Sequence, residues 1–216
     1  MRRRVFSVIF CVILALAAGV RIYQVNTADY YRYFPVRKFY SRGEQVPLNN
    51  DHYYFTRRDW SGYTVEVTDA RIEKTEAFLA ERHAPEGFLA QNGYVQNNHH
   101  AYDYLCIVTA VFRYDGTDSL EKDPVSLAEF KLLGPDYTLA SVPELNGLPA
   151  FNSSMKGNSR FVITSGKPFT VEIPFFISTG FETDMSVEYF QKSDPQLLVT
   201  YYPEESCIAV FSEDAP

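Results

Sequence analysis

Four histidines are the first residues to test for chemistry, because a neutral imidazole is a common metal ligand and proton carrier. They are His52, His83 and the adjacent pair His99 and His100. Neighbouring side chains of an extended chain point to opposite faces, so the adjacent pair is a poor bidentate ligand. None of the four belongs to a His-x-His or His-Glu-x-x-His motif. The spacing therefore predicts solvated loop histidines rather than a metal site.

Three aspartates, Asp115, Asp118 and Asp123, lie close enough in the sequence to be considered for calcium, which takes about six to eight oxygen ligands. Their spacing matches no calcium-loop motif. Asp and Gly also supply the backbone conformations of turns, and Asp115-Gly116-Thr117-Asp118 directly follows an apolar run. We therefore predict turn residues here, and no metal or other cofactor.

Serine nucleophiles are present, but none lies in a recognised catalytic motif. The serines considered lie outside any Gly-x-Ser-x-Gly elbow, the strained turn that presents the nucleophile of many hydrolases; they are Ser41, Ser61, Ser153, Ser154 and Ser165. A carboxylate pair for hydrolysis of cell-wall glycans stays open as an alternative, because the separation of two carboxylates is a property of the fold. The prediction is a protein that is not an enzyme.

The cysteines of the chain are either free thiols or one disulfide-bonded pair. Cys11 lies in the apolar N-terminal segment, which leaves Cys106 and Cys207, both in apolar, strand-like runs. Two cysteines are too few for a disulfide scaffold. They are either two separately buried thiols that pack as small hydrophobes or one Cys106–Cys207 disulfide, which requires Cα atoms within about 7 Å of each other.

The N-terminus carries an apolar run, VFSVIFCVILALAAGV, at residues 5–20. Three arginines precede the run and Arg21 follows it, so the positive-inside rule places the N-terminus in the cytoplasm and the rest of the chain outside. The run is shorter than the roughly 20 residues of an average spanning helix, but Arg21 and Tyr23 can extend it at the interface. We predict a single-pass signal anchor at residues 1–25, in contact with the membrane through residues 5–25. Cleavage near Ala15-Leu16-Ala17, which would release a secreted protein, stays open.

The charge of the remaining chain excludes one class of partner. After Arg21 it contains 16 basic and 27 acidic residues, a net charge of −11. Such a domain repels polyanions. We therefore predict no binding to nucleic acid.

Apolar patterning then predicts the elements that position these residues. Residues 26–61 are predicted as a stalk with a short entry strand near 45–48, and residues 62–216 as one domain. Residues 62–72 alternate like a half-buried strand, and residues 102–114 are apolar on both faces like a central strand. Residues 75–82 contain good helix formers and predict one short inserted helix. Further strands are predicted at 125–133, 137–142, 160–164, 169–177, 196–202 and 207–212.

About seven to nine strands joined by turns, without β-α-β alternation, predict a mainly all-β fold. Its predicted form is an immunoglobulin-like antiparallel β-sandwich with one inserted helix, following the N-terminal transmembrane helix. An antiparallel barrel is the alternative.

The aromatic residues suggest a binding surface. Most of the 16 Tyr and 17 Phe must fill the core of a sandwich. In an adjacent aromatic pair on a strand, however, one ring faces outward. Phe175, Phe176, Tyr201 and Tyr202 are therefore candidate partner-binding residues.

Five short stretches of the sequence are distinctive: Arg21-Ile22-Tyr23-Gln24-Val25-Asn26, Gly43-Glu44-Gln45-Val46-Pro47, Gly62-Tyr63-Thr64-Val65, the YLCIVTAVFRYDGTD run, and Ser165-Gly166-Lys167-Pro168 before the apolar run 169–176. Together they resemble a family of uncharacterised Gram-positive exported proteins. The resemblance implies a signal anchor that carries an immunoglobulin-like domain of unknown function outside the membrane. It assigns no functional residue.

These observations favour an interaction module of the cell envelope that binds an unknown envelope protein or wall component. The first alternative is a small-ligand or cation receptor that uses the loop 81–101. The second is the glycan hydrolase considered above.

Overall fold

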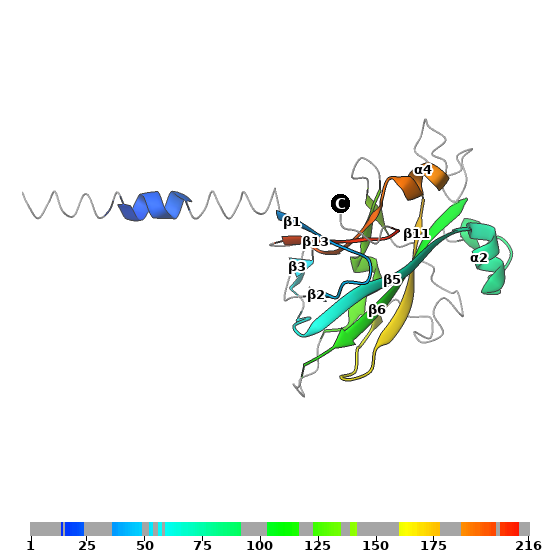
Figure 1. Ribbon diagram of the computed structural model, residues 1–216, viewed down its shortest axis with the longest axis horizontal. Coiled ribbons are helices and arrows are strands. Elements are labelled where there is room, and N and C mark those ends of the chain that lie inside the picture. The colour runs from blue at the N-terminus through cyan, green and yellow to red at the C-terminus, as the bar shows by residue number, and fades with distance from the viewer. Residues whose placement is uncertain are drawn as a thin grey trace, which may run out of the picture.

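The computed structural model describes residue 14 and residues 16–23, 36–48, 52–53, 56–57, 59–91, 103–116, 123–134, 139–141, 160–177, 187–201, 204–211. Figure 1 shows an N-terminal helix that leads to a β-rich domain. The strands are β1 (Val36–Tyr40), β2 (Val46–Leu48), β3 (His52–Tyr53), β4 (Thr56–Arg57), β5 (Tyr63–Lys74), β6 (Tyr104–Tyr114), β7 (Val125–Ser126), β8 (Lys131–Leu133), β9 (Leu139–Ser141), β10 (Arg160–Phe161), β11 (Phe169–Phe176), β12 (Gln196–Thr200) and β13 (Glu204–Ala209). The helices are α2 (Thr75–Glu81), α3 (Phe88–Gln91), the short 3-10 helix η1 (Leu127–Glu129) and α4 (Val187–Lys192).

A four-stranded antiparallel sheet has the order β11-β6-β5-β2. Strand β6 pairs along almost its full length with β5 on one side and β11 on the other, as its two apolar faces predict. Strand β11 contains Pro174, which cannot donate a ladder hydrogen bond, and it lies at the edge, where that loss is tolerated. The register of β5 shifts between Val67 and Asp69.

The second large sheet has the order β1-β13-β12-β8-β9. Its pairings are antiparallel except for that of β1, which runs parallel to β13. Two two-stranded sheets, β10-β7 and β3-β4, complete the described strands.

The two large sheets enclose one hydrophobic core. Val65 and Phe112 from the four-stranded sheet and Leu132, Leu197 and Ile208 from the five-stranded sheet all belong to one cluster of buried residues. Two sheets that pack face to face around one core are the arrangement of a β-sandwich.

Helix α2 follows β5 and covers one end of the four-stranded sheet. Its first amide, that of Thr75, donates to Asp103 O at 2.8 Å, so the helix begins beside the start of β6. It ends near His83, whose φ of 53° is in the left-handed region that commonly terminates helices. Phe78 and Phe88, from α2 and α3, are buried in the same cluster as Leu105 and Ile107 of β6.

Most of the predicted elements are confirmed. The predicted strands at 62–72, 102–114 and 169–177 correspond to β5, β6 and β11, and the predicted helix at 75–82 to α2. The expected strand at 125–133 is instead divided into β7, η1 and β8. The prediction of one inserted helix is wrong, since α3 and α4 are also present. Residues 36–48, predicted as stalk with an entry strand, contribute β1 and β2 to the large sheets.

Within the described part of the chain, no helix is both long and apolar enough to cross a membrane. The described N-terminal helix comprises residues 16–23, and all of them are exposed.

Candidate functional site

The residues tested first for catalysis or metal binding do not form a site in the described structure. No three His, Cys, Asp or Glu side chains among the described residues come together as metal ligands. His83 lies in the turn after α2, His52 lies in β3, and His99 and His100 lie outside the described residues. Among the described serines, Ser61 Oγ donates to Asp59 Oδ1 at 2.6 Å, and Ser165 Oγ donates to Gly116 O at 3.2 Å. Ser153 and Ser154 are not described.

Two of the candidate calcium aspartates contact residues that are distant in the sequence. Asp115 N donates to Gly62 O at 3.1 Å, and a carboxylate oxygen of Asp123 accepts from Asp59 N at 2.8 Å. Asp118 lies outside the described residues. Residues 117–122 lie outside the described residues, so the prediction that these aspartates build turns stays a prediction.

Cys106 and Cys207 are free, buried thiols, so the disulfide alternative is not realised. The two residues belong to different hydrophobic clusters. Cys106 faces the core between the sheets, whereas Cys207 packs with Leu133 and Leu198 in a second cluster. Because Ile208, next to Cys207 on β13, faces the core, Cys207 points to the opposite side of its sheet.

Burial raises the pKa of each thiol to about 12. The neutral thiol is the form that the fold stabilises, because removing a thiolate from water is unfavourable. Neither cysteine is therefore suited to nucleophilic catalysis near neutral pH.

These pKa shifts predict a loss of stability in alkali. Each folded pKa lies above the pKa of an unfolded thiol, so the stabilisation is complete below about pH 8.5 and is lost between that value and about pH 12. We expect the free energy of unfolding to fall by up to about 1.4 kcal/mol per pH unit per thiol in this range. Urea titrations from pH 7 to 10.5 will measure it. A Cys207→Ala variant should show a smaller slope, and an unchanged slope would contradict the assignment.

The predicted aromatic patch is contradicted for Phe175 and Phe176. Both side chains are buried in the main core cluster. The alternation argument fails because β11 is covered on both faces at this end. Phe176 pairs with Leu105, and both side chains are buried. The face that was expected to be open is therefore covered.

Tyr201 is partly buried and packs against the cluster of Leu133, Leu198 and Cys207. Its hydroxyl donates to Glu129 O at 2.8 Å, which ties the end of β12 to η1. Tyr202 lies outside the described residues, so the predicted role of this second aromatic pair stays a prediction.

The four-stranded sheet instead presents a surface of ordered charges. We call it the charged face, formed by Glu66 and Arg71 of β5, Arg113 of β6, Glu172 of β11, and Arg82 after α2. The register places the strand residues on the side of the sheet opposite Val65, Phe112 and Val171. The side chains of Glu66, Arg71, Arg113 and Glu172 are partly exposed.

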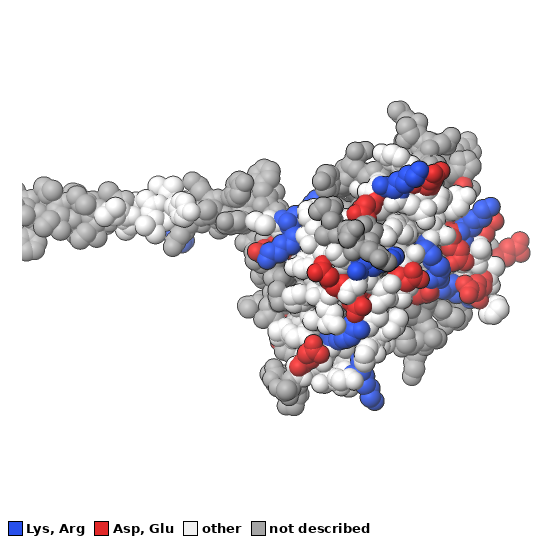
Figure 2. Space-filling view, viewed as in Figure 1, with Lys and Arg blue, Asp and Glu red and all other residues white. Residues whose placement is uncertain are grey.

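Ion pairs fix the charged face in place. Arg113 Nη1 donates to Glu66 Oε2 at 2.5 Å. Glu172 joins two cations: its Oε1 accepts from Arg71 Nη1 at 2.7 Å and its Oε2 from Arg82 Nη2 at 2.6 Å. The Glu172 carboxylate also raises the pKa of Arg71, mainly through this hydrogen bond. Figure 2 shows positive and negative side chains intermingled over the domain.

A second set of ion pairs joins β1 to β13. Arg37 Nε donates to Glu205 Oε2 at 2.7 Å, and Lys38 forms an ion pair with Glu204. The hydrogen bond from Lys38 to the Glu204 carboxylate raises the pKa of that lysine. Both acceptors belong to adjacent residues at the start of β13.

Sequence reasoning missed both charged sets. The alternation of residues 62–72 indicated that Glu66 faces solvent, but not which cation lies beside it. The partners are 47, 101 and 90 residues apart in the pairs Glu66–Arg113, Arg71–Glu172 and Arg82–Glu172. The cross-strand register of three strands brings the strand residues together, and the position of α2 brings Arg82 to Glu172.

A family model described as a domain of unknown function (DUF5028) matches residues 37–206. The match begins in β1 and ends within β13, so it includes the four-stranded sheet, most of the five-stranded sheet and the charged face. No curated protein and no solved structure matches the chain.

Proposed function

The chain belongs to the family described as a domain of unknown function (DUF5028), and on this premise we propose that it is a membrane-anchored, non-catalytic interaction module of the cell envelope. In this proposal the β-rich domain has an immunoglobulin-like fold and lies outside the membrane. It binds an envelope protein or wall component through the charged face.

The N-terminal helix supports the anchor. Its large apolar side chains are exposed, with Leu16, Ile22 and Tyr23 at 65%, 61% and 70%. Apolar surface in water costs roughly 25 cal/mol per Å². A membrane removes this surface from water, and the three arginines before the helix orient it.

The charged face is the observation that carries the binding role. Its side chains are partly exposed, yet ion pairs hold them in defined positions. Binding a partner therefore requires less ordering of these long side chains than binding to unpaired ones. Alternating charges also discriminate among partners, because a mismatched like charge is unfavourable.

A charge swap tests the proposal on the full-length protein in intact cells. In the double variant Glu66→Arg/Arg113→Glu the ion pair is kept and its direction is reversed. The matched control is Glu188→Lys/Lys192→Glu, which reverses the exposed pair on α4. After crosslinking and capture, we expect one specific partner with the natural chain and with the control. Capture should fall at least tenfold with the swapped face, about 1.4 kcal/mol of binding free energy.

Two results would contradict the proposal. One is equal capture of that partner by a swapped face that has the natural melting temperature. The other is turnover of a wall glycan by the purified protein at rates ordinary for enzymes, roughly 1 to 1,000 per second.

A further inference from the structure

Strand β1 is attached to the domain with little core contact. None of its five residues is fully buried, and among its hydrophobic side chains Tyr40 alone packs partly against the main core. The short strand β2, by contrast, buries Val46 and Leu48 completely. Local regions with few buried apolar contacts open at lower free energy than the core. The release of strand β1 would therefore disturb the core little.

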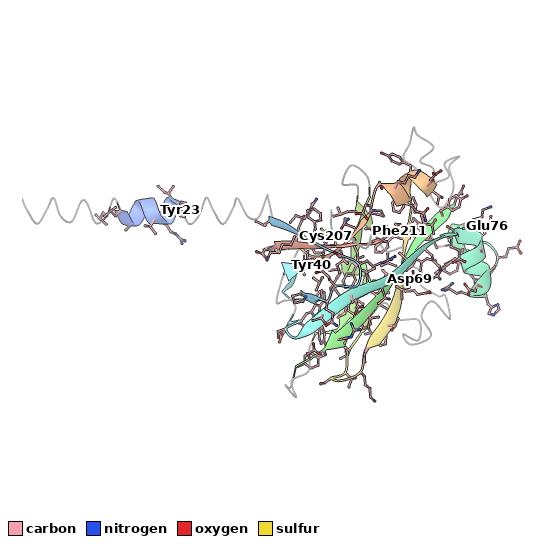
Figure 3. All side chains as sticks on the ribbon, viewed as in Figure 1. Tyr23, Tyr40, Asp69, Glu76, Cys207 and Phe211 are labelled. Carbon is pink, nitrogen blue, oxygen red and sulfur yellow. The ribbon has the colours of Figure 1, made fainter. Side chains whose placement is uncertain are left out.

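The edge of β13 that pairs with β1, residues 204–208, must be covered by a strand; we call this edge the β13 seat. The register pairs Phe39 with Cys207 and Tyr40 with Ile208, and both β13 residues are fully buried. Figure 3 shows Cys207 on β13 and Tyr40 at the end of β1. If β1 left, β13 would present a row of unpaired backbone groups beside apolar side chains, a template for another strand.

The charges at the start of β13 favour a strand that carries adjacent cations. The seat begins with Glu204 and Glu205, which pair with Lys38 and Arg37. An incoming strand without adjacent cations leaves two carboxylates unpaired. A β1 strand from a second chain supplies the same cations, the same aromatic pair and the same parallel register.

The connection from β1 to β2 provides a hinge. It consists of residues 41–45, with Gly43 at a φ of 89°. Gly43 N donates to Val67 O at 2.9 Å, and Glu44 N donates to Ser41 O at 3.2 Å. If this turn extends, β1 is carried away from its own domain while β2 stays in the core.

We propose that two copies of this chain associate by exchanging β1, so that β1 of each copy occupies the β13 seat of the other. Exchange of an identical element preserves every native contact except those of the hinge, and it is a low-cost route to a dimer. The exchanged surface is distinct from the charged face, so either proposal can fail without the other.

A disulfide trap tests the exchange. Neighbouring strands lie about 4.8 Å apart, within the Cα separation that a disulfide tolerates. One full-length chain carries Cys11→Ser, Phe39→Cys and Cys207→Ser. A second chain with a different tag carries Cys11→Ser and keeps Phe39 and Cys207. The two are expressed together and oxidised in membranes. The introduced thiol then meets Cys207 only when β1 of the first chain lies on β13 of the second.

We expect a disulfide-linked heterodimer on a non-reducing gel, and its loss when the second chain also carries Cys207→Ser. That control keeps Cys106, so a bridge to Cys106 would persist in it. A single chain with Cys11→Ser and Phe39→Cys, which keeps Cys207, reports whether positions 39 and 207 can form a disulfide at all. If that single chain forms an internal disulfide as a monomer, but the two-chain experiment gives no heterodimer, the proposed exchange is wrong. Failure of both bridges contradicts the β1–β13 register and overturns the proposal as well.

Discussion

Replacing Phe112 with alanine is expected to lower the free energy of unfolding by about 4 kcal/mol. Phe112 lies on the central strand β6 and is completely buried. Its ring centroid lies 5.1 Å from that of Phe161 on β10 and 5.5 Å from that of Phe130, beside β8. Phe161 stacks in turn on Phe169 of β11, at 4.6 Å.

The size of this effect follows from the position of the ring. Rings from four segments meet here, so a cavity at Phe112 lies where the two large sheets and the small β10-β7 sheet join. Close-packed surroundings collapse only partly into such a cavity, and the lost contacts add to the lost burial. The β5 and β11 ladders fix β6 on both sides and limit its movement.

Urea unfolding monitored by circular dichroism will measure the change. Phe39→Ala is the matched control, because Phe39 is 40% exposed on the edge strand β1. Its expected cost is less than about 1.5 kcal/mol. A Phe112→Ala cost no larger than that of Phe39→Ala would mean that the sheets do not share one core.

The elements around Phe112 show how much of the fold the sequence predicts. The run 102–114 is apolar on both faces, and this pattern correctly predicts a central strand. Alternation in residues 62–72 likewise predicts β5, and helix formers followed by Pro85 predict α2. Each of these signals is local, because it depends on residues within one element.

The features that the sequence did not predict are non-local. Strand β1 has no alternating apolar pattern, and it pairs with residues more than 160 positions away. Phe175 and Phe176 form an adjacent aromatic pair, but both faces of β11 are covered at this end, so both rings are buried. Strand periodicity describes the two faces of a sheet and contains no information about what lies on each of them.

The charged face depends on the same long-range order, and Arg82 tests it. Arg82→Ala is expected to lower the free energy of unfolding by about 2 kcal/mol. The side chain is 10% exposed, and it joins Glu172 to the end of α2. Its guanidinium carbon also lies 3.7 Å from the centre of the Phe78 ring, an attractive cation–π contact.

Two opposing effects set this magnitude. Removing one partner of a fully buried ion pair costs about 3–5 kcal/mol, because it leaves a charge buried without compensation. Glu172 is partly exposed, however, and Arg71 remains on its other oxygen, so the loss here should be smaller. Lys192→Ala is the control: its pair with Glu188 is 74% exposed on both sides and should contribute less than about 0.5 kcal/mol.

A double-mutant cycle then separates the ion pair from the packing of Phe78. If Arg82 acts mainly through Glu172, then Glu172→Ala and Arg82→Ala together should destabilise the domain by at least about 1 kcal/mol less than the sum of the single variants. If the cycle shows additivity, the guanidinium acts through the Phe78 ring, and the charged face is not held by α2. A coupled result means that the order of the exposed charges depends on a helix inserted between two strands. Changes in that helix would then alter binding without altering any residue that touches the partner.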